Sequence, residues 1–222
     1  MANAIIALAG GIIISYLLGS ISFAVVFSWA FSHKDVRNYG SGNAGMTNVL
    51  RSVGVLPGVL TFVCDFLKGV VAVLIGRYLV FAFAQPFGVI IPEYATFFCG
   101  MACQLGHIFP VFYGFRGGKS VSTSVAVLFA VDWRAGFIAL GTFVLMVLIT
   151  KIVSISSIVG ALTAPFSLWL LLPKNSTLLW QVLLCSWIVA VLVIAHWQNI
   201  GRLIRGEEKK LTIKLSRRKG DK

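Results

Sequence analysis

Four clusters of glycine, hydroxyl, amide and cationic residues interrupt an otherwise apolar sequence. They fall at residues 40–51, 106–120, 153–157 and 196–199. Glycine lets the backbone approach a ligand closely, and successive N–H groups can form a concavity that binds anions. Lysine and arginine add the positive charge that phosphate requires. We therefore expect these clusters to act together on a polar, phosphate-bearing substrate at a membrane surface.

The first cluster combines a glycine-rich backbone with polar side chains that suit phosphate. Ser41, Gly42, Asn43 and Asn48 offer neutral hydrogen bonds, and Arg51 offers a planar cation for bidentate contact. The simpler interpretation is a glycine-rich connecting loop, and this cluster taken alone does not decide between the two.

The second cluster contains Gly117, Gly118 and Lys119 followed by serine, an order similar to a nucleotide-binding P-loop. That motif requires an earlier glycine at the position of Tyr113 and a preceding strand, so the ATPase interpretation fails. What remains is a lysine beside flexible backbone, which is consistent with binding a second phosphate.

The third cluster is a run of three serines, Ser154, Ser156 and Ser157, where one apolar span meets the next. Hydroxyls at a helix start cap it, and a helix N-terminus attracts anions. Capping alone is the alternative, and the sequence does not identify which serine acts.

The fourth cluster places His196 and Asn199 on one helix face, just before a basic tail. Of the other polar residues, His107 fits a structural role better, because it lies in a Gly-His-Ile-Phe-Pro bend. Asp65 and Lys68, three apart inside an apolar span, are functional candidates by position, although an ion pair that ties helices together is favoured.

The elements that carry these clusters are transmembrane helices. Apolar residues make up 58% of the 222-residue chain and charged residues 12%, far from the balance of a soluble domain. Runs of about 20 apolar residues, enough to cross a bilayer, recur along the chain. We predict an all-α polytopic membrane protein of about seven transmembrane helices, at residues 4–31, 55–81, 94–113, 121–133, 135–151, 155–173 and 176–200.

The positive charges orient this bundle. Seven spans place the termini on opposite sides, and the basic tail is expected in the cytoplasm, so the N-terminus lies outside. The cytoplasmic side then holds 15 of the 19 lysines and arginines, against two outside. All four clusters fall on that cytoplasmic side. We expect one integral-membrane domain over residues 1–205 and a basic cytoplasmic tail over 206–222.

Composition also excludes other classes of protein. The net charge of +12 comes largely from nine cations after Ile200, a juxtamembrane pattern that favours anionic lipid over nucleic acid. The four cysteines lie in apolar segments, without histidines at ligand spacing, so neither a disulfide framework nor a metal site is predicted. No cofactor is expected.

Together the clusters resemble the acyl-phosphate-dependent glycerol-3-phosphate acyltransferases of bacteria, the PlsY family. The resemblance runs from Gly19 to about Leu211. Its most specific pieces are Gly-Ser-Gly-Asn with Thr-Asn-Val-Leu-Arg over 40–51, Asp-x-x-Lys-Gly over 65–69, Gly-His-Ile-Phe-Pro-Val-Phe over 106–112, Phe-x-Gly-Gly-Lys over 115–119, and His-x-x-Asn-Ile-x-Arg-Leu over 196–203.

The resemblance implies a seven-helix enzyme of the bacterial inner membrane with its active site facing the cytoplasm. Such enzymes transfer a fatty acyl group from acyl phosphate to the 1-hydroxyl of sn-glycerol 3-phosphate, giving lysophosphatidic acid and phosphate. It further implies membrane lipid as a partner and functional coupling to the enzyme that forms acyl phosphate. At the matching positions, the phosphate-binding and catalytic set comprises Ser41, Arg51, Lys119, Ser154, His196 and Asn199.

Some positions depart from the family pattern. Family members commonly carry proline where Ser22 and Ala44 stand, alanine at Met46, and an acidic residue at Gln198. The stretch 120–123 also differs, and none of these departures removes a residue assigned to the site.

Two questions of mechanism stay open at this level. The general base is either His196 or an oxygen of the acyl phosphate itself, and the second option needs no dedicated carboxylate. The walls of the acyl groove are not identified, although the aromatic-rich stretches 81–87 and 97–115 are candidates.

Other functions fit less well. Glycerolipid acyltransferases of the soluble type use His-x-x-x-x-Asp, and no histidine here has aspartate five positions on. A small organic-phosphate transporter is the non-enzymatic alternative, but it calls for polar groups near the midplane and for paired broken helices in two halves.

Overall fold

The structure is a computed structural model that describes residues 2–84 and 92–211, and within these ranges it is helical. The described elements are α1 (Ala2–Gly19), α2 (Phe23–Ser32), η1 (Val36–Asn38), α3 (Met46–Ser52), α4 (Val55–Leu74), η2 (Ile75–Val80), α5 (Phe81–Ala84), α6 (Pro92–Ile108), η4 (Val111–Tyr113), α7 (Val121–Val131), α8 (Trp133–Thr150), α9 (Val153–Leu171), α10 (Leu178–Ala195) and α11 (Trp197–Ile204).

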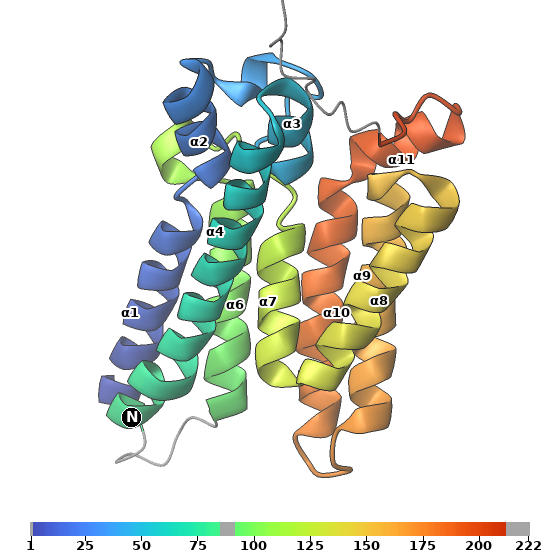
Figure 1. The fold of residues 1–222 in the computed structure, drawn as a ribbon. Coiled ribbons are helices and arrows are strands. Elements are labelled where there is room, and N and C mark those ends of the chain that lie inside the picture. The colour runs from blue at the N-terminus through green and yellow to red at the C-terminus, as the bar shows by residue number, and fades with distance from the viewer. Residues whose placement is uncertain (1, 85–91, 212–222) are drawn as a thin grey trace, which may run out of the picture.

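The long helices form an up-and-down bundle (Figure 1). The α2 and α3 helices, α11, and the loops that precede α7 and α9 gather at one end, which we call the polar end. The N-terminus and the loop between α9 and α10 lie at the opposite end. Residues from all four sequence clusters are therefore carried to the polar end, although long stretches of chain separate them.

Six segments of the described chain are long and apolar enough to cross a membrane: Asn3–Ser32, Val55–Val80, Tyr94–Tyr113, Trp133–Thr150, Val153–Leu171 and Leu178–Ala195. The remaining predicted span, 121–133, which is the fourth in chain order, is the shorter helix α7. Its 11 residues extend about 16 Å, roughly half of the hydrocarbon thickness. Since α7 packs within the bundle between α4 and α8, it is shielded by protein on several sides.

The first predicted span is not one continuous helix. The α1 helix ends at Gly19, and α2 begins at Phe23, with three residues between them. The Lys68 ammonium donates to the carbonyl oxygens of Gly19 and Ile21, at 2.9 and 2.7 Å, and pairs with Asp65 at 2.9 Å. Carbonyls left open at a helix end need such a donor. The predicted Asp65–Lys68 ion pair is present, and it stabilises the break between α1 and α2.

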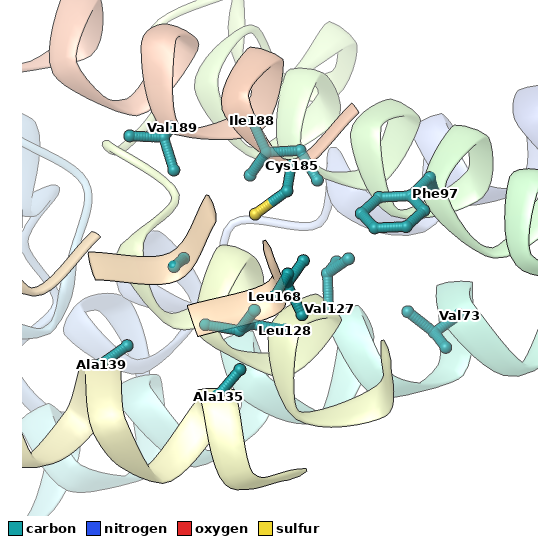
Figure 2. Packing of buried hydrophobic residues seen from close by; sticks show 11 residues of the cluster. Val73, Phe97, Val127, Leu128, Ala135, Ala139, Leu168, Cys185, Ile188 and Val189 are labelled. Atoms are coloured by element: carbon teal, nitrogen blue, oxygen red, sulfur yellow. The ribbon is translucent and has the colours of Figure 1, made fainter. Parts of the chain in front are cut away.

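The core lies where α6, α7, α8, α9 and α10 meet. Its buried cluster includes Phe97, Val127, Leu128, Leu168 and Cys185, which face one another in Figure 2. The α8 and α9 helices pack closely, because a Cβ atom at Gly160 would lie 2.9 Å from the Ala139 carbonyl oxygen. Large apolar side chains cover the outside of the bundle, as in Leu170, which is 75% exposed. An apolar exterior is suited to lipid.

Candidate active site

A cavity of about 660 Å³ opens at the polar end and extends into the bundle. Its mouth is polar and its interior is mostly apolar, although Asp65, His107 and Ser124 also belong to its lining. Polar residues at the mouth include Ser41, Asn43, Asn48, Arg51, Lys119, Ser154, Ser157, His196, Asn199, Arg202 and Glu208. Of the 12 predicted site residues, nine line the cavity, whereas Gly42, Gly117 and Gly118 do not.

The carboxylate of Glu208 joins three side chains at this mouth. It accepts hydrogen bonds from Ser154 Oγ at 2.8 Å, Asn199 Nδ2 at 2.5 Å and Arg202 Nε at 2.7 Å. Burial raises the pKa of Glu208, but these three donors more than offset that effect and hold the pKa below its usual range. The donors are thus arranged around an oxyanion.

Lys119 reaches the same group of residues, since its ammonium donates to Asn199 Oδ1. Burial lowers the pKa of Lys119 to about 8; the Arg202 and Arg51 charges lower it further, while Glu208 raises it. Three cations around one carboxylate leave an excess of positive charge at the cavity mouth.

The glycine loop before α7 holds Lys119 in place. Gly117 N–H donates to the Ile108 carbonyl oxygen at 3.2 Å, and Gly118 N–H to that of His107 at 3.0 Å. A Cβ atom at Gly118 would lie 2.2 Å from His107 Nε2, so only glycine fits there. Both N–H groups are committed to the chain. These bonds seat the loop on α6, and the phosphate-binding role predicted for the two glycines stays a prediction.

Asn48 organises the first cluster from within. Its amide donates to the carbonyl oxygens of Val36, Tyr39 and Asn43, each at 3.0 Å, and its Oδ1 accepts from the Ser41 N–H at 3.0 Å. Asn48 lines the cavity, yet its polar atoms serve the loop. The structure thus gives Asn48 a structural role, while its phosphate-binding role stays a prediction.

Gly42 has a similar role in that loop. Its φ of +72° lies in the left-handed region that favours glycine, and its N–H donates to the Tyr39 carbonyl oxygen at 3.0 Å. The N–H groups of Ser41, Gly42, Ala44 and Gly45 are bonded within the chain, and the anion-binding concavity predicted for this cluster stays a prediction. The side chains of Ser41 and Asn43 lie among the residues that line the cavity.

We expect Asn48→Ala to destabilise the protein, because three carbonyls lose a buried donor at once. A buried polar group left unpaired costs about 1–3 kcal/mol, which exceeds the effect of an ordinary surface substitution. The measurement is the thermal denaturation midpoint in detergent. Asn38→Ala, which alters an exposed amide of the same segment, is the matched control. Equal midpoints for the two variants would contradict the structural role.

Arg51 extends from α3 toward the chain that follows α11. Its Nη2 lies 3.3 and 3.4 Å from the carbonyl oxygens of Lys209 and Lys210. These are weak contacts for a guanidinium, which forms shorter, bidentate bonds with phosphate. Arg51 thus lies at the mouth without a strong anionic partner among the described residues.

The serine run separates into one residue that faces the site and two that face their own helix. Ser156 and Ser157 donate to the carbonyl oxygens of Ile152 and Val153, at 2.7 and 2.9 Å. Ser154 instead donates to Glu208. Ser154 is the serine whose hydroxyl bonds across the site, while Ser157 lines the cavity with its hydroxyl directed at the backbone.

His196 lies between α10 and α11 with a defined tautomer. Its Nδ1 is 2.8 Å from the Leu192 carbonyl oxygen, and a carbonyl can only accept, so Nδ1 carries the proton. Nε2 is then the acceptor. Burial lowers the pKa of His196 to about 4, and Lys119 adds to this effect, although the Leu192 bond and Glu208 oppose it. His196 is therefore neutral at pH 7.

Beneath the mouth, His107 lies beside the ion pair that ties α1 to α4. Its Nδ1 is 3.5 Å from Asp65 Oδ1, and both residues are buried. Through the packing of Gly118 on its ring, His107 supports the loop that carries Lys119. This placement fits the structural role expected from its bend.

Glu208 and Arg202 were not among the residues assigned to the site from the sequence. Arg202 belongs to the His-x-x-Asn-Ile-x-Arg-Leu motif over 196–203, but the motif alone predicts no role for it. Glu208 lies in the segment expected to be a tail, yet residues 206–211 pack over the site, and Leu211 N–H donates to the Lys151 carbonyl oxygen at 2.6 Å. The predicted domain boundary after residue 205 therefore falls inside the site. Residues 212–222 of that tail lie outside the described chain.

The inner part of the cavity is formed by α7, α8, α9 and α10 with help from α4 and α6. Phe97 lines the cavity, and it belongs to the aromatic-rich stretch 97–115, a candidate wall of the acyl groove. The other stretch, 81–87, lies partly outside the described residues. A helical membrane bundle whose cavity joins a cationic mouth to a mostly apolar interior defines a class of protein: membrane proteins that bind lipids with anionic head groups.

Comparisons with known proteins specify the class further. The family model for glycerol-3-phosphate acyltransferase matches residues 9–206. The chain is 44% identical over 200 residues to the glycerol-3-phosphate acyltransferase of Thermoanaerobacter sp. (strain X514), covering 90% of this chain and 93% of that one. It is 40% identical to the enzyme of Thiobacillus denitrificans (strain ATCC 25259 / T1), covering 90% and 95% of the two chains.

Two solved structures share the fold. Crystal structures of PlsY, an integral membrane glycerol 3-phosphate acyltransferase, match in its glycerol 3-phosphate form (TM-score 0.79, 35% identity, 92% of this chain and 96% of that one) and its lysophosphatidic acid form (TM-score 0.76, 33% identity, 93% and 96%). This chain belongs to the glycerol-3-phosphate acyltransferase family. Its activity is acyl transfer to glycerol 3-phosphate, a reaction of phospholipid biosynthesis.

Proposed function

We propose that this enzyme takes its acyl group from acyl phosphate and transfers it to the 1-hydroxyl of sn-glycerol 3-phosphate. The products are 1-acylglycerol 3-phosphate and inorganic phosphate. The observation that carries the proposal is the excess charge at the cavity mouth, where Lys119, Arg51 and Arg202 surround a single carboxylate. Two phosphate-bearing substrates, held together, would balance that charge.

The polar residues at the mouth take separate roles in this proposal. Lys119 and Arg51 are the cations for the two phosphate groups, with Ser41 and Asn43 beside them at the opening. Asn199 and Ser154 add neutral hydrogen bonds, and the N-terminus of α9, where Ser154 lies, favours an anion. Positioning two substrates and stabilising developing charge accounts for most of the rate enhancement.

The acyl transfer is direct in this scheme. The substrate hydroxyl attacks the carbonyl carbon of acyl phosphate, an ester bond forms, and the bond from that carbon to the phosphate oxygen breaks. The hydroxyl proton passes to the departing phosphate. His196 Nε2 accepts a hydrogen bond from the other free hydroxyl of glycerol 3-phosphate and so orients the substrate, since a group with a pKa of about 4 is a weak base. Glu208, whose pKa is also low, does not activate Ser154 as a nucleophile.

The placement in the membrane is also part of this proposal. We propose that α7 completes a seven-helix crossing as the short fourth member, with the N-terminus outside and the polar end in the cytoplasm of a bacterial inner membrane. The basic residues near the polar end support this orientation. Acyl phosphate is a reactive anhydride, and for this reason we also propose functional coupling to the enzyme that forms it.

The test of donor choice is acyl transfer by purified protein to radiolabelled glycerol 3-phosphate. Palmitoyl phosphate, palmitoyl-CoA and palmitoyl acyl carrier protein are compared at equal concentration. We expect lysophosphatidic acid from the acyl phosphate alone. Faster transfer from either thioester would overturn the proposal. Absence of product with all three donors, with uptake of glycerol 3-phosphate into proteoliposomes, would favour transport instead.

The low pKa of Lys119 predicts how substrate binding depends on pH. The ammonium is charged below pH 8 and loses its charge above it, while the phosphate of the substrate stays ionised throughout this range. We expect KM for glycerol 3-phosphate to rise by about tenfold per pH unit above pH 8. In Lys119→Arg the guanidinium remains charged, so the alkaline rise should vanish even if activity is lower. The same alkaline rise of KM in the wild-type protein and in Lys119→Arg would show that a group other than Lys119 causes it.

A further inference from the structure

The inner half of the cavity has a defined depth. Along α9 its lining passes from Ser154 at the mouth to Ala164 as the deepest residue, ten positions on. At a rise of about 1.5 Å per residue, this distance is about 15 Å. The lining of α10 ends at a similar depth, with Cys185.

The cavity ends because larger side chains close it. One helical turn below Ala164 lies Leu168, which is fully buried in the core. Figure 2 shows Leu168 beside Leu128 and Val127, across from Cys185, with Phe97 at the far side. These residues form a packed apolar floor, and no charged residue is among the members of that core cluster.

Small residues leave the space above this floor. Gly160, Ala161 and Ala164 of α9 and Ala139 of α8, where the two helices pack closely, form one wall of the cavity. Protein interiors are otherwise packed so closely that voids larger than a water molecule are few. An apolar void of this kind accepts an apolar ligand. Because the void is continuous with the polar mouth, its occupant is the hydrocarbon of a lipid whose head group lies among the cations.

We propose that Ala164 and Cys185 determine the length of acyl chain that the enzyme accepts, by setting the depth of the cavity floor below the reacting carbonyl. This inference rests on the proposed function, in which the acyl phosphate carbonyl lies at the mouth. A chain that fits gains about 0.8 kcal/mol for each buried methylene, which corresponds to about fourfold in kcat/KM. A chain that reaches the floor loses that gain for every further methylene.

The test compares kcat/KM for a series of saturated acyl phosphates, from dodecanoyl to stearoyl phosphate. Ala164→Leu raises the floor, so we expect the preferred chain to shorten by two or more methylenes. Stearoyl phosphate should lose at least tenfold relative to dodecanoyl phosphate. Leu168→Ala lowers the floor and should move the preference toward longer chains. Ala190→Leu makes the same change as the first variant at an exposed position of α10 and should leave the profile unchanged.

Several outcomes overturn the inference. An unchanged length profile in Ala164→Leu and Leu168→Ala, with transfer intact, would show that long chains leave the cavity sideways into the bilayer. If Ala164→Leu does not fold, Ala164→Val provides a smaller change in the same direction, and the same unshifted profile would refute the proposal. Absence of transfer from every acyl phosphate by the wild-type protein would instead refute the donor assignment, and the length inference with it.

Discussion

Replacing Lys119 by alanine is expected to lower kcat/KM by about 10²–10³ or more, the effect of removing a group that stabilises transition-state charge. Lys119 is buried against Asn199 between the charges of Arg51 and Arg202. No water-exposed cation can replace it there. The measurement is the initial rate of acyl transfer over a range of glycerol 3-phosphate concentrations, with acyl phosphate as the donor.

Two controls separate charge from folding in that experiment. Lys174→Ala removes an exposed lysine from the opposite end of the bundle and should leave the rate unchanged. Lys119→Met keeps much of the apolar stem while removing the charge, and it should be as inactive as Lys119→Ala. A loss of less than tenfold in both Lys119→Ala and Lys119→Met would show that Lys119 is not part of the active site.

Replacing His196 by alanine is expected to reduce kcat by about 10²-fold, because the substrate loses the acceptor that orients it for attack. His196→Gln retains a side chain that can accept a hydrogen bond, so it should recover most of the lost rate. A general base contributes about 10²–10⁴, and glutamine cannot replace that function. The two variants therefore distinguish an orienting role from proton transfer.

The pH profile provides a second readout for His196. Since burial keeps its pKa near 4, the ring is neutral at every pH above about 5. We therefore expect the pH dependence of kcat between pH 5.5 and 7.5 to be the same in the wild-type protein and in His196→Gln. An inflection that is present in the wild-type protein and absent from His196→Gln, together with a His196→Gln variant as inactive as His196→Ala, would establish His196 as the base. A loss below tenfold in His196→Ala would exclude both roles.

The membrane fold could be predicted because it depends on composition and on the distribution of charge. Long apolar runs identify spans, and the cations identify one side. The break after Gly19 could not be predicted, because no helix-breaking proline marks it. It depends on Lys68, which lies on another helix and donates to the carbonyls of the break. A tertiary contact of this kind leaves no local pattern.

The candidate site could be predicted in its residue types but not in all of its roles. Lys119, His196 and Asn199 line one cavity, as their clustering suggested. Asn48 and Gly118 have the right chemistry for phosphate, yet the backbone around them uses their polar groups. Sequence spacing cannot show whether an N–H group is already bonded.

Glu208 was missed for a different reason. It lies among lysines after the last predicted helix, where composition indicates a solvated tail. Its partners Ser154, Asn199 and Arg202 come from three helical segments that only the fold brings together. In a chain with seven acidic residues, a carboxylate next to several cations is a weak signal.

Direct acyl transfer is tested most sharply by a single-turnover measurement of phosphate release from palmitoyl phosphate. The enzyme is in excess, and release is compared in the presence and absence of glycerol 3-phosphate. Direct transfer between two bound phosphate compounds predicts release only when glycerol 3-phosphate is present, one phosphate for each lysophosphatidic acid formed. A stoichiometric burst of phosphate without glycerol 3-phosphate, leaving acyl-labelled protein, would show a covalent intermediate and contradict the mechanism.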